Sequence, residues 1–286
     1  MNNKTDGSQN DTADYIQMPI FGLIILLTNF YTIIILSQKT FRNKKFNWLT
    51  MNICFASFTF SVIEIFSIVI RLIDVSKTMV SCRVLGFIID QPVCYIMYSH
   101  CVTSFCRFLS IRYPRKLFFR SNYWLVGNII FSIILSTILA LPFLFTDGFA
   151  CTSMNGNNSF MKFYSLLSTM FLPILIIILC NIVILCFVRK STRRIQDLNQ
   201  NAPHRLNKRD MYLYKIFMLT FFIFTLGWLP IFIEQMFFNG QSQLPTISTN
   251  VIQVLPAVSL LADTILIIYS DSSTRNLIVR TCQCRS

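Results

Sequence analysis

The sequence predicts an all-α membrane protein, folded as a bundle of seven transmembrane helices. Of its 286 residues, 54% are hydrophobic and only 13% are charged, and the mean hydropathy is +0.58. Soluble domains carry about 25% charged residues, so this chain lacks the polar side chains that a water-facing surface needs. Its apolar residues gather in seven segments, each long enough to cross about 30 Å of hydrocarbon as a helix.

These apolar segments cover residues 16–38, 47–73, 79–112, 123–146, 161–188, 211–238 and 246–269. They are longer than barrel strands and lack the period-two alternation of strands, so helices are expected. The third segment has the least distinct ends, because it carries Arg83, Asp90, His100 and Arg107.

The basic residues predict the orientation of the chain in the membrane. The loops after spans one, three and five, the tail and the adjoining helix ends hold 20 of the 25 lysines and arginines. Cytoplasmic loops are enriched in these residues, so this side is cytoplasmic and the amino terminus is extracellular. The net charge of +13 then reflects contact with the lipid bilayer and requires no nucleic acid. We expect a multi-pass protein of the plasma membrane.

Potential glycosylation sites agree with this orientation. The sequence Asn-x-Ser/Thr occurs at Asn3, Asn10 and Asn157, all on the predicted outer side. The chain is thus expected to comprise an extracellular glycosylated amino terminus, a seven-transmembrane domain and a cytoplasmic tail, at residues 1–15, 16–269 and 270–286.

Two short motifs accompany the seven spans. The third segment ends in CRFLSIRYP, which contains Arg107 and Pro114, and the sixth contains FTLGWLP, which supplies Phe224, Trp228 and Pro230. Together with short loops and an outer amino terminus, these motifs make the whole chain resemble the rhodopsin-like (class A) G-protein-coupled receptors. Within that family it looks like a divergent member, similar to invertebrate neuropeptide receptors.

The resemblance implies an activation switch. In the family, the arginine at the end of span three bonds an acid eighteen residues before the span-six tryptophan, which corresponds here to Asp210. We expect a resting contact between Arg107 and Asp210, although Asp210 also suits the start of a helix, where an acid favours the dipole. Phe224, Trp228 and Pro230 match the family's core switch, and ordinary packing is the alternative.

The resemblance also assigns roles to four cysteines. Cys82, at the outer end of span three, corresponds to a cysteine that forms a disulfide with the loop after span four, where Cys151 lies. Cys282 and Cys284 resemble the palmitoylated cysteines of the family's tail, and they follow a segment expected to form a short amphipathic eighth helix.

Other signature positions depart from the family pattern. The usual span-two aspartate is Ser57, and the span-seven Asn-Pro motif begins instead with Asp263. Asn29 matches the family's span-one asparagine. Because the span-two acid is missing, a bound sodium ion is not expected, and Asp263 is predicted either to hold a proton or to bond Asn29 and Ser57.

The outer halves of the spans suggest the kind of ligand. No lysine occurs in span seven, which excludes a Schiff base with retinal. The family's amine-binding aspartate position is Ile89, and Asp90 beside it is rotated by about 100° on a helix, toward a neighbouring span. The candidate ligand-binding residues are polar or aromatic: Glu64, Asp90, Gln91, Phe232, Glu234, Gln235 and Gln253.

These observations predict a receptor that binds an extracellular peptide or small ligand, with a short neuropeptide favoured, and that activates a heterotrimeric G protein. An enzyme is not expected, since no metal-ligand spacing emerges, and no cofactor or metal is implied. One alternative is a chemosensory receptor of the same fold. Another is a seven-span transporter or channel, which would be expected to show inverted repeats or glycine-broken helices.

Overall fold

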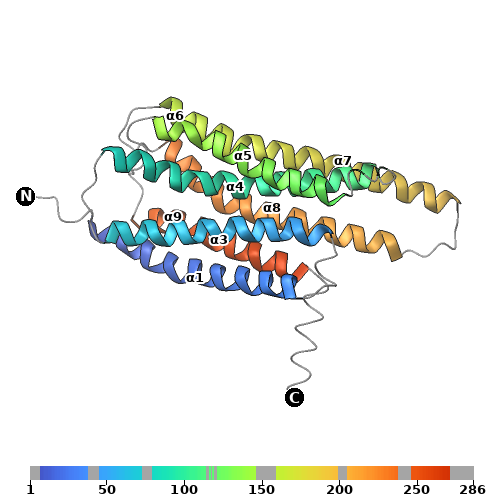
Figure 1. The fold of residues 1–286 in the computed structure, drawn as a ribbon, viewed down its shortest axis with the longest axis horizontal. Helices are drawn as coiled ribbons and strands as arrows, with labels where there is room; N and C mark the ends of the chain where they lie inside the picture. Colours follow the sequence, from blue (N-terminus) through green and yellow to red (C-terminus); the bar gives the residue numbers. More distant parts are fainter. Residues whose placement is uncertain are drawn as a thin grey trace, which may run out of the picture.

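The computed structural model describes residues 7–37, 45–72, 79–113, 116, 118, 121–145, 159–198, 205–237 and 246–270. Seven long helical rods run side by side along the molecule (Figure 1). Their bounds are α1 Gly7–Ser37, α3 Lys45–Leu72, α4 Met79–Arg112, α5 Asn122–Phe145, a fifth rod made of α6 Ser159–Ser165, η2 Leu166–Phe171 and α7 Leu172–Leu198, then α8 Arg205–Phe237 and α9 Thr246–Ser270.

The predicted seven-helix bundle is confirmed, and most ends agree with the apolar segments within two residues. Three ends differ by more: α1 begins at Gly7 and not at residue 16, α7 ends at Leu198 and not at residue 188, and α8 begins at Arg205 and not at residue 211. Ala13 and Asp14, which precede the predicted first span, are buried against the bundle. The tail from residue 271 onward, including the expected eighth helix, lies outside the described residues.

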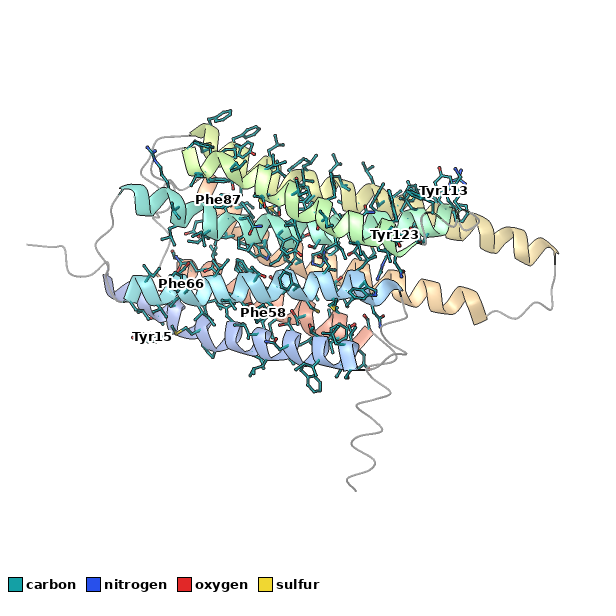
Figure 2. All side chains as sticks on the ribbon, in the orientation of Figure 1. Tyr15, Phe58, Phe66, Phe87, Tyr113 and Tyr123 are labelled. Atoms are coloured by element: carbon teal, nitrogen blue, oxygen red, sulfur yellow. The ribbon has the colours of Figure 1, made fainter. Side chains whose placement is uncertain are left out.

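Consecutive rods run in opposite directions, so α1 begins at one end of the bundle and α9 finishes at the other (Figure 1). The end of α7 and the start of α8 extend past the other helices. Tyr113 and Tyr123 lie toward this end, whereas Phe66 and Phe87 lie toward the opposite end (Figure 2). The basic residues at the end of α4, at the end of α7 and at the start of α8 therefore lie at the end marked by Tyr113.

Helix α4 shows how a helix with ionisable residues fits into an apolar bundle. Five helical stretches are long and apolar enough to cross a membrane by composition alone, at Thr12–Ser37, Asn47–Ile70, Asn122–Phe145, Phe163–Phe187 and Ser248–Ser270. Helix α4 is not among them, but its residues 92–103 are all buried by other helices. Polar side chains inside a membrane face the bundle interior because hydrocarbon cannot solvate them. Helix α4 therefore occupies the centre.

Helices α8 and α9 approach each other closely at Gly227. A Cβ atom built on this glycine would overlap both the Cβ and the Oγ of Ser259, and would lie 3.1 Å from the Leu255 carbonyl oxygen. Small residues allow transmembrane helices to pack backbone against backbone, which maximises van der Waals contact in the absence of a hydrophobic driving force. The missing side chain at position 227 thus sets the spacing beside Trp228.

Candidate functional site

An aromatic column on α8 runs through the core of the bundle. Phe224, Trp228 and Phe232 are spaced four residues apart and so share one face of the helix. The rings of Phe224 and Trp228 stack at 5.5 Å with 25° between their planes, and those of Trp228 and Phe232 are 6.4 Å apart. Trp228 also lies 5.6 Å from Phe60 of α3, which packs edge-on against Phe21 of α1. The column thus contacts α3 directly and reaches α1 through Phe60.

At the Phe224 end of this column, a buried ionisable pair joins α4 to α9. His100 Nε2 lies 3.2 Å from Asp263 Oδ2, and Asp263 is fully buried. The imidazole ring is also 5.5 Å from the ring of Phe224. The contact has the distance of an ion pair without the angle of a directed hydrogen bond, because neither carboxylate oxygen has a hydrogen-bond partner among the described residues.

A hydrogen-bonded chain links α3 to α4 next to this pair. The Tyr95 hydroxyl donates to Asn52 Oδ1 at 2.7 Å, and Asn52 Nδ2 donates to the Ser99 hydroxyl at 3.0 Å. The Thr103 hydroxyl donates to the Ser99 carbonyl at 2.8 Å. All four residues are buried. Since buried polar groups are costly when unpaired, this chain constrains the relative rotation of the two helices.

A π-helical turn in the fifth rod creates a second polar cluster. Within η2, the Leu172 amide bonds the Leu167 carbonyl, one residue farther back than in an α-helix. That shift leaves the Ser168 carbonyl without its α-helical donor, and the Tyr98 hydroxyl of α4 donates to it at 2.8 Å. Beside it, the Cys94 thiol lies 3.4 Å from Thr169 Oγ1 and 3.6 Å from Asp90 Oδ2.

Asp90 therefore faces the fifth rod, as its one-residue offset from Ile89 predicts. The remaining candidate ligand residues lie toward the end of the bundle where α3 finishes and α9 begins. Phe232 is buried, whereas four others are partly buried: Glu64, Gln91, Glu234 and Gln253. The backbone carbonyl of Gln253 accepts a hydrogen bond from Gln17 of α1 at 2.8 Å. The side chain of Gln235 lies outside the described part of the chain.

Of the two alternatives given for Asp263, the bond to Asn29 is not formed. The Asn29 side chain faces away from the bundle and donates to the Ile25 carbonyl of its own helix at 2.9 Å. Its neighbour Thr28 faces inward instead. Ser57 is buried, and no hydrogen bond joins it to Asp263 in the described part of the structure. The rotation of α1 about its axis, which turns the Asn29 side chain away from the bundle, is the physical reason that this bond is absent.

Several predicted site residues fall where the structure makes no statement. Arg107 lies on α4 and is partly buried, but the side chain of Asp210 is not described, so their expected contact stays a prediction. Cys54, Cys94, Cys101, Cys106, Cys180 and Cys186 are free thiols. The other predictions outside the described side chains concern Cys82, Cys151, Cys282, Cys284, Asn3, Asn10 and Asn157.

Three contacts were not predicted from the sequence. They are the His100–Asp263 pair, the Tyr95–Asn52–Ser99 chain and the bond from Tyr98 to the Ser168 carbonyl. Among these residues, His100 and Asp263 offered a local signal, since each is an ionisable residue within an apolar span. An intramembrane ionisable residue is a functional candidate by default, and its partner is decided by the fold.

Comparison with known proteins identifies the family of this chain. Residues 28–265 match the family model described as 7 transmembrane receptor (rhodopsin family). The chain belongs to the rhodopsin family of seven-transmembrane receptors. This receptor is therefore a multi-pass membrane protein of the G-protein-coupled class, a family of receptors rather than enzymes.

A solved structure supports the same fold for the receptor. The crystal structure of squid rhodopsin superposes with a TM-score of 0.73 at 18% sequence identity, covering 96% of this chain and 86% of the squid protein. At this identity the likeness concerns the fold alone. No curated protein sequence matches the chain.

Proposed function

We propose that this receptor resides in the plasma membrane with its amino terminus outside, binds a short peptide, and activates a heterotrimeric G protein. One observation carries the proposal: the Phe232–Trp228–Phe224 column leads from the end with the partly buried polar residues to the His100–Asp263 pair. A ligand that contacts the outer end of this column can bias the arrangement of helices around it. A population shift of this kind requires only that the ligand bind one arrangement better than the other.

The chemistry near the outer end favours a peptide with a basic group. Glu64 and Glu234 are partly buried carboxylic acids, on α3 and α8. Gln91 and Gln253 add side-chain amides, which pair well with the backbone groups of a bound peptide. Phe232 lies below them with its ring in the core. A small amine with a single cation would use few of these groups, whereas a short peptide would use both the acids and the amides.

The opposite end suits a G protein. The segments that extend past the bundle, from α7 and α8, carry the basic third loop, and Arg107 lies near the same end of α4. We propose that Arg107 contacts Asp210 in the resting state and leaves it when α8 moves. On this basis Asp210→Asn should raise ligand-free signalling several-fold in cells with equal surface expression. Unchanged basal output in well-expressed protein would contradict the resting contact.

The same proposal assigns the covalent features of the outer face and the tail. We propose a disulfide between Cys82 and Cys151, glycans at Asn3, Asn10 and Asn157, and palmitoylation at Cys282 and Cys284. The charge distribution supports this placement, because it puts the first five residues on the oxidising side and the last two in the cytoplasm.

The deciding experiment is a screen of a short-peptide library on cells that express the receptor, read through intracellular calcium and cyclic nucleotide. We expect activation by peptides with a basic residue, and weaker activation when Glu64→Gln and Glu234→Gln are introduced. Phe222→Ala, on the outward face of α8, is a matched control because its ring is exposed and outside the column. Activation by small odorant-like molecules but not by peptides would instead favour a chemosensory receptor.

A further inference from the structure

The carboxylate of Asp263 presents a physical problem at the centre of the bundle. The residue is 0% exposed, on a helix surrounded by apolar neighbours such as Leu260 and Ile267. An ionised carboxylate in such surroundings costs several kcal/mol unless a countercharge accompanies it. Among the described residues, His100 is the ionisable side chain in ion-pair contact with it, at 3.2 Å between Nε2 and Oδ2.

The geometry of His100 gives this contact a second consequence. The same imidazole that faces Asp263 on α9 lies against the ring of Phe224 on α8, with 5.5 Å between ring centroids and 41° between their planes. Phe224 in turn stacks on Trp228. A single side chain of α4 therefore touches both the aromatic column and the buried acid of the last helix.

The pair is electrically neutral when it holds one acidic proton between Nε2 and Oδ2. The proton resides either on the imidazole, giving imidazolium and carboxylate, or on the acid, giving neutral imidazole and a carboxylic acid. Both forms have the same number of protons, so the pair needs no further ion. Removing the histidine leaves the carboxylate without this partner, whereas removing the acid leaves an imidazole that can be neutral.

We propose that His100 and Asp263 form a charge-neutral latch that ties α9 to α4, and that His100 is the positioning residue that couples Phe224 to this latch. Displacement of Phe224 then disturbs the latch, and loss of the latch releases α9. The latch stabilises the resting arrangement. This proposal rests on the proposed coupling of the receptor to a G protein, but not on the identity of the ligand.

The test is a double-mutant cycle without ligand, with two measurements on the full chain. The first is thermal unfolding of the purified receptor, followed with a thiol-reactive dye that labels the buried free cysteines Cys54, Cys94, Cys101 and Cys106 as they become exposed. The second is basal signalling per receptor at the cell surface. The variants are His100→Leu, Asp263→Asn, the two together, and the exchanged pair His100→Asp/Asp263→His.

The latch predicts that Asp263→Asn lowers the unfolding temperature when His100 is present and raises it when His100 is replaced by leucine. His100→Leu should lower the unfolding temperature by about 10 °C, because it leaves a buried carboxylate unpaired. Adding Asp263→Asn to His100→Leu should recover much of that loss, whereas Asp263→Asn alone should lower the unfolding temperature of the parent receptor. Both single variants should raise basal signalling about fivefold or more, and the exchanged pair should bring it back toward the parent level.

Thr264→Val is the matched control on the same helix. Thr264 is buried beside Asp263, and its hydroxyl bonds the Leu260 carbonyl of its own helix at 2.9 Å. Its replacement should leave basal signalling unchanged. Additive effects of His100→Leu and Asp263→Asn, with no recovery by the exchanged pair, would overturn the latch. If His100→Leu yields no folded receptor but His100→Leu/Asp263→Asn does, the yield alone shows that Asp263→Asn stabilises the receptor when His100 is absent. If neither variant folds, the basal signalling of Asp263→Asn and of the exchanged pair tests the latch.

Discussion

Replacing Gly227 by alanine tests the close approach of α8 and α9. The new methyl group would overlap the Cβ and Oγ atoms of Ser259, and it would stand 3.1 Å from the Leu255 carbonyl, which cannot rotate away. Carbon atoms that are not bonded pack at about 3.5–4.0 Å, so the two helices must separate. Overpacking of this kind costs about 1–3 kcal/mol, which corresponds to an unfolding temperature lower by about 3–10 °C.

The chain supplies its own controls for this prediction. A Cβ atom at Gly22 or Gly127 meets nothing within 4 Å, so Gly22→Ala and Gly127→Ala should leave the unfolding temperature unchanged or slightly raised. These variants make the same chemical change, in helices α1 and α5, without a collision. Thermal unfolding of the three purified variants, measured with the thiol-reactive dye, separates the effect of packing from that of helix propensity.

Second-site variants identify the colliding atom. Ser259→Gly removes both atoms that the new methyl group meets, so Gly227→Ala should cost less in that background than in the parent receptor. Ser259→Ala removes the Oγ but keeps the Cβ, so it should give less relief. If Gly227→Ala unfolds at the same temperature as the Gly127→Ala control, or if both serine variants relieve it equally, the close approach of the helices at this point is wrong.

Two further predictions concern other contacts. Tyr95→Phe removes the hydroxyl that donates to Asn52 and leaves a buried amide oxygen without that donor, which should lower the free energy of unfolding by about 1–3 kcal/mol. Tyr123→Phe is the control, because its ring is 91% exposed and its replacement should leave the unfolding temperature unchanged. Equal effects of the two variants in thermal unfolding would argue against the buried hydrogen bond. Cys82→Ser and Cys151→Ser should reduce surface expression to the same extent, with no further loss in the double variant, whereas unequal losses measured by surface labelling would contradict the proposed disulfide.

Parts of the candidate site follow from local sequence alone. The spacing of Phe224, Trp228 and Phe232 places three rings on one face of α8 by helical periodicity, and the structure shows Phe224 stacked on Trp228 and Phe232 tilted against it. The offset of Asp90 from Ile89 predicts that this acid faces a neighbouring helix, and it lies beside Cys94 and the π-helical turn. Each of these inferences uses only the geometry of a single helix.

Other parts were beyond the reach of the sequence. Asn29 matches the family's span-one asparagine, but its side chain faces away from the bundle and Thr28 faces inward instead. The partner of Asp263 proved to be His100, which lies 163 residues earlier in the chain. Likewise, the bond from Tyr98 depends on a π-helical turn in another rod, for which no local sequence rule exists. Each of these contacts depends on how one helix is rotated and shifted against another.

The sequence by itself determined the number of spans, their order and the side on which the basic residues gather. These properties depend on the length and composition of each segment in turn, because hydrocarbon excludes polar backbone and charge wherever they occur. Only the tertiary structure decided that the least apolar helix, α4, stands at the centre, that Gly227 meets Ser259, and that His100 faces Asp263. Those outcomes require the packing of several helices at once, since interhelical partners are chosen by fit between surfaces and not by the order of residues along one of them.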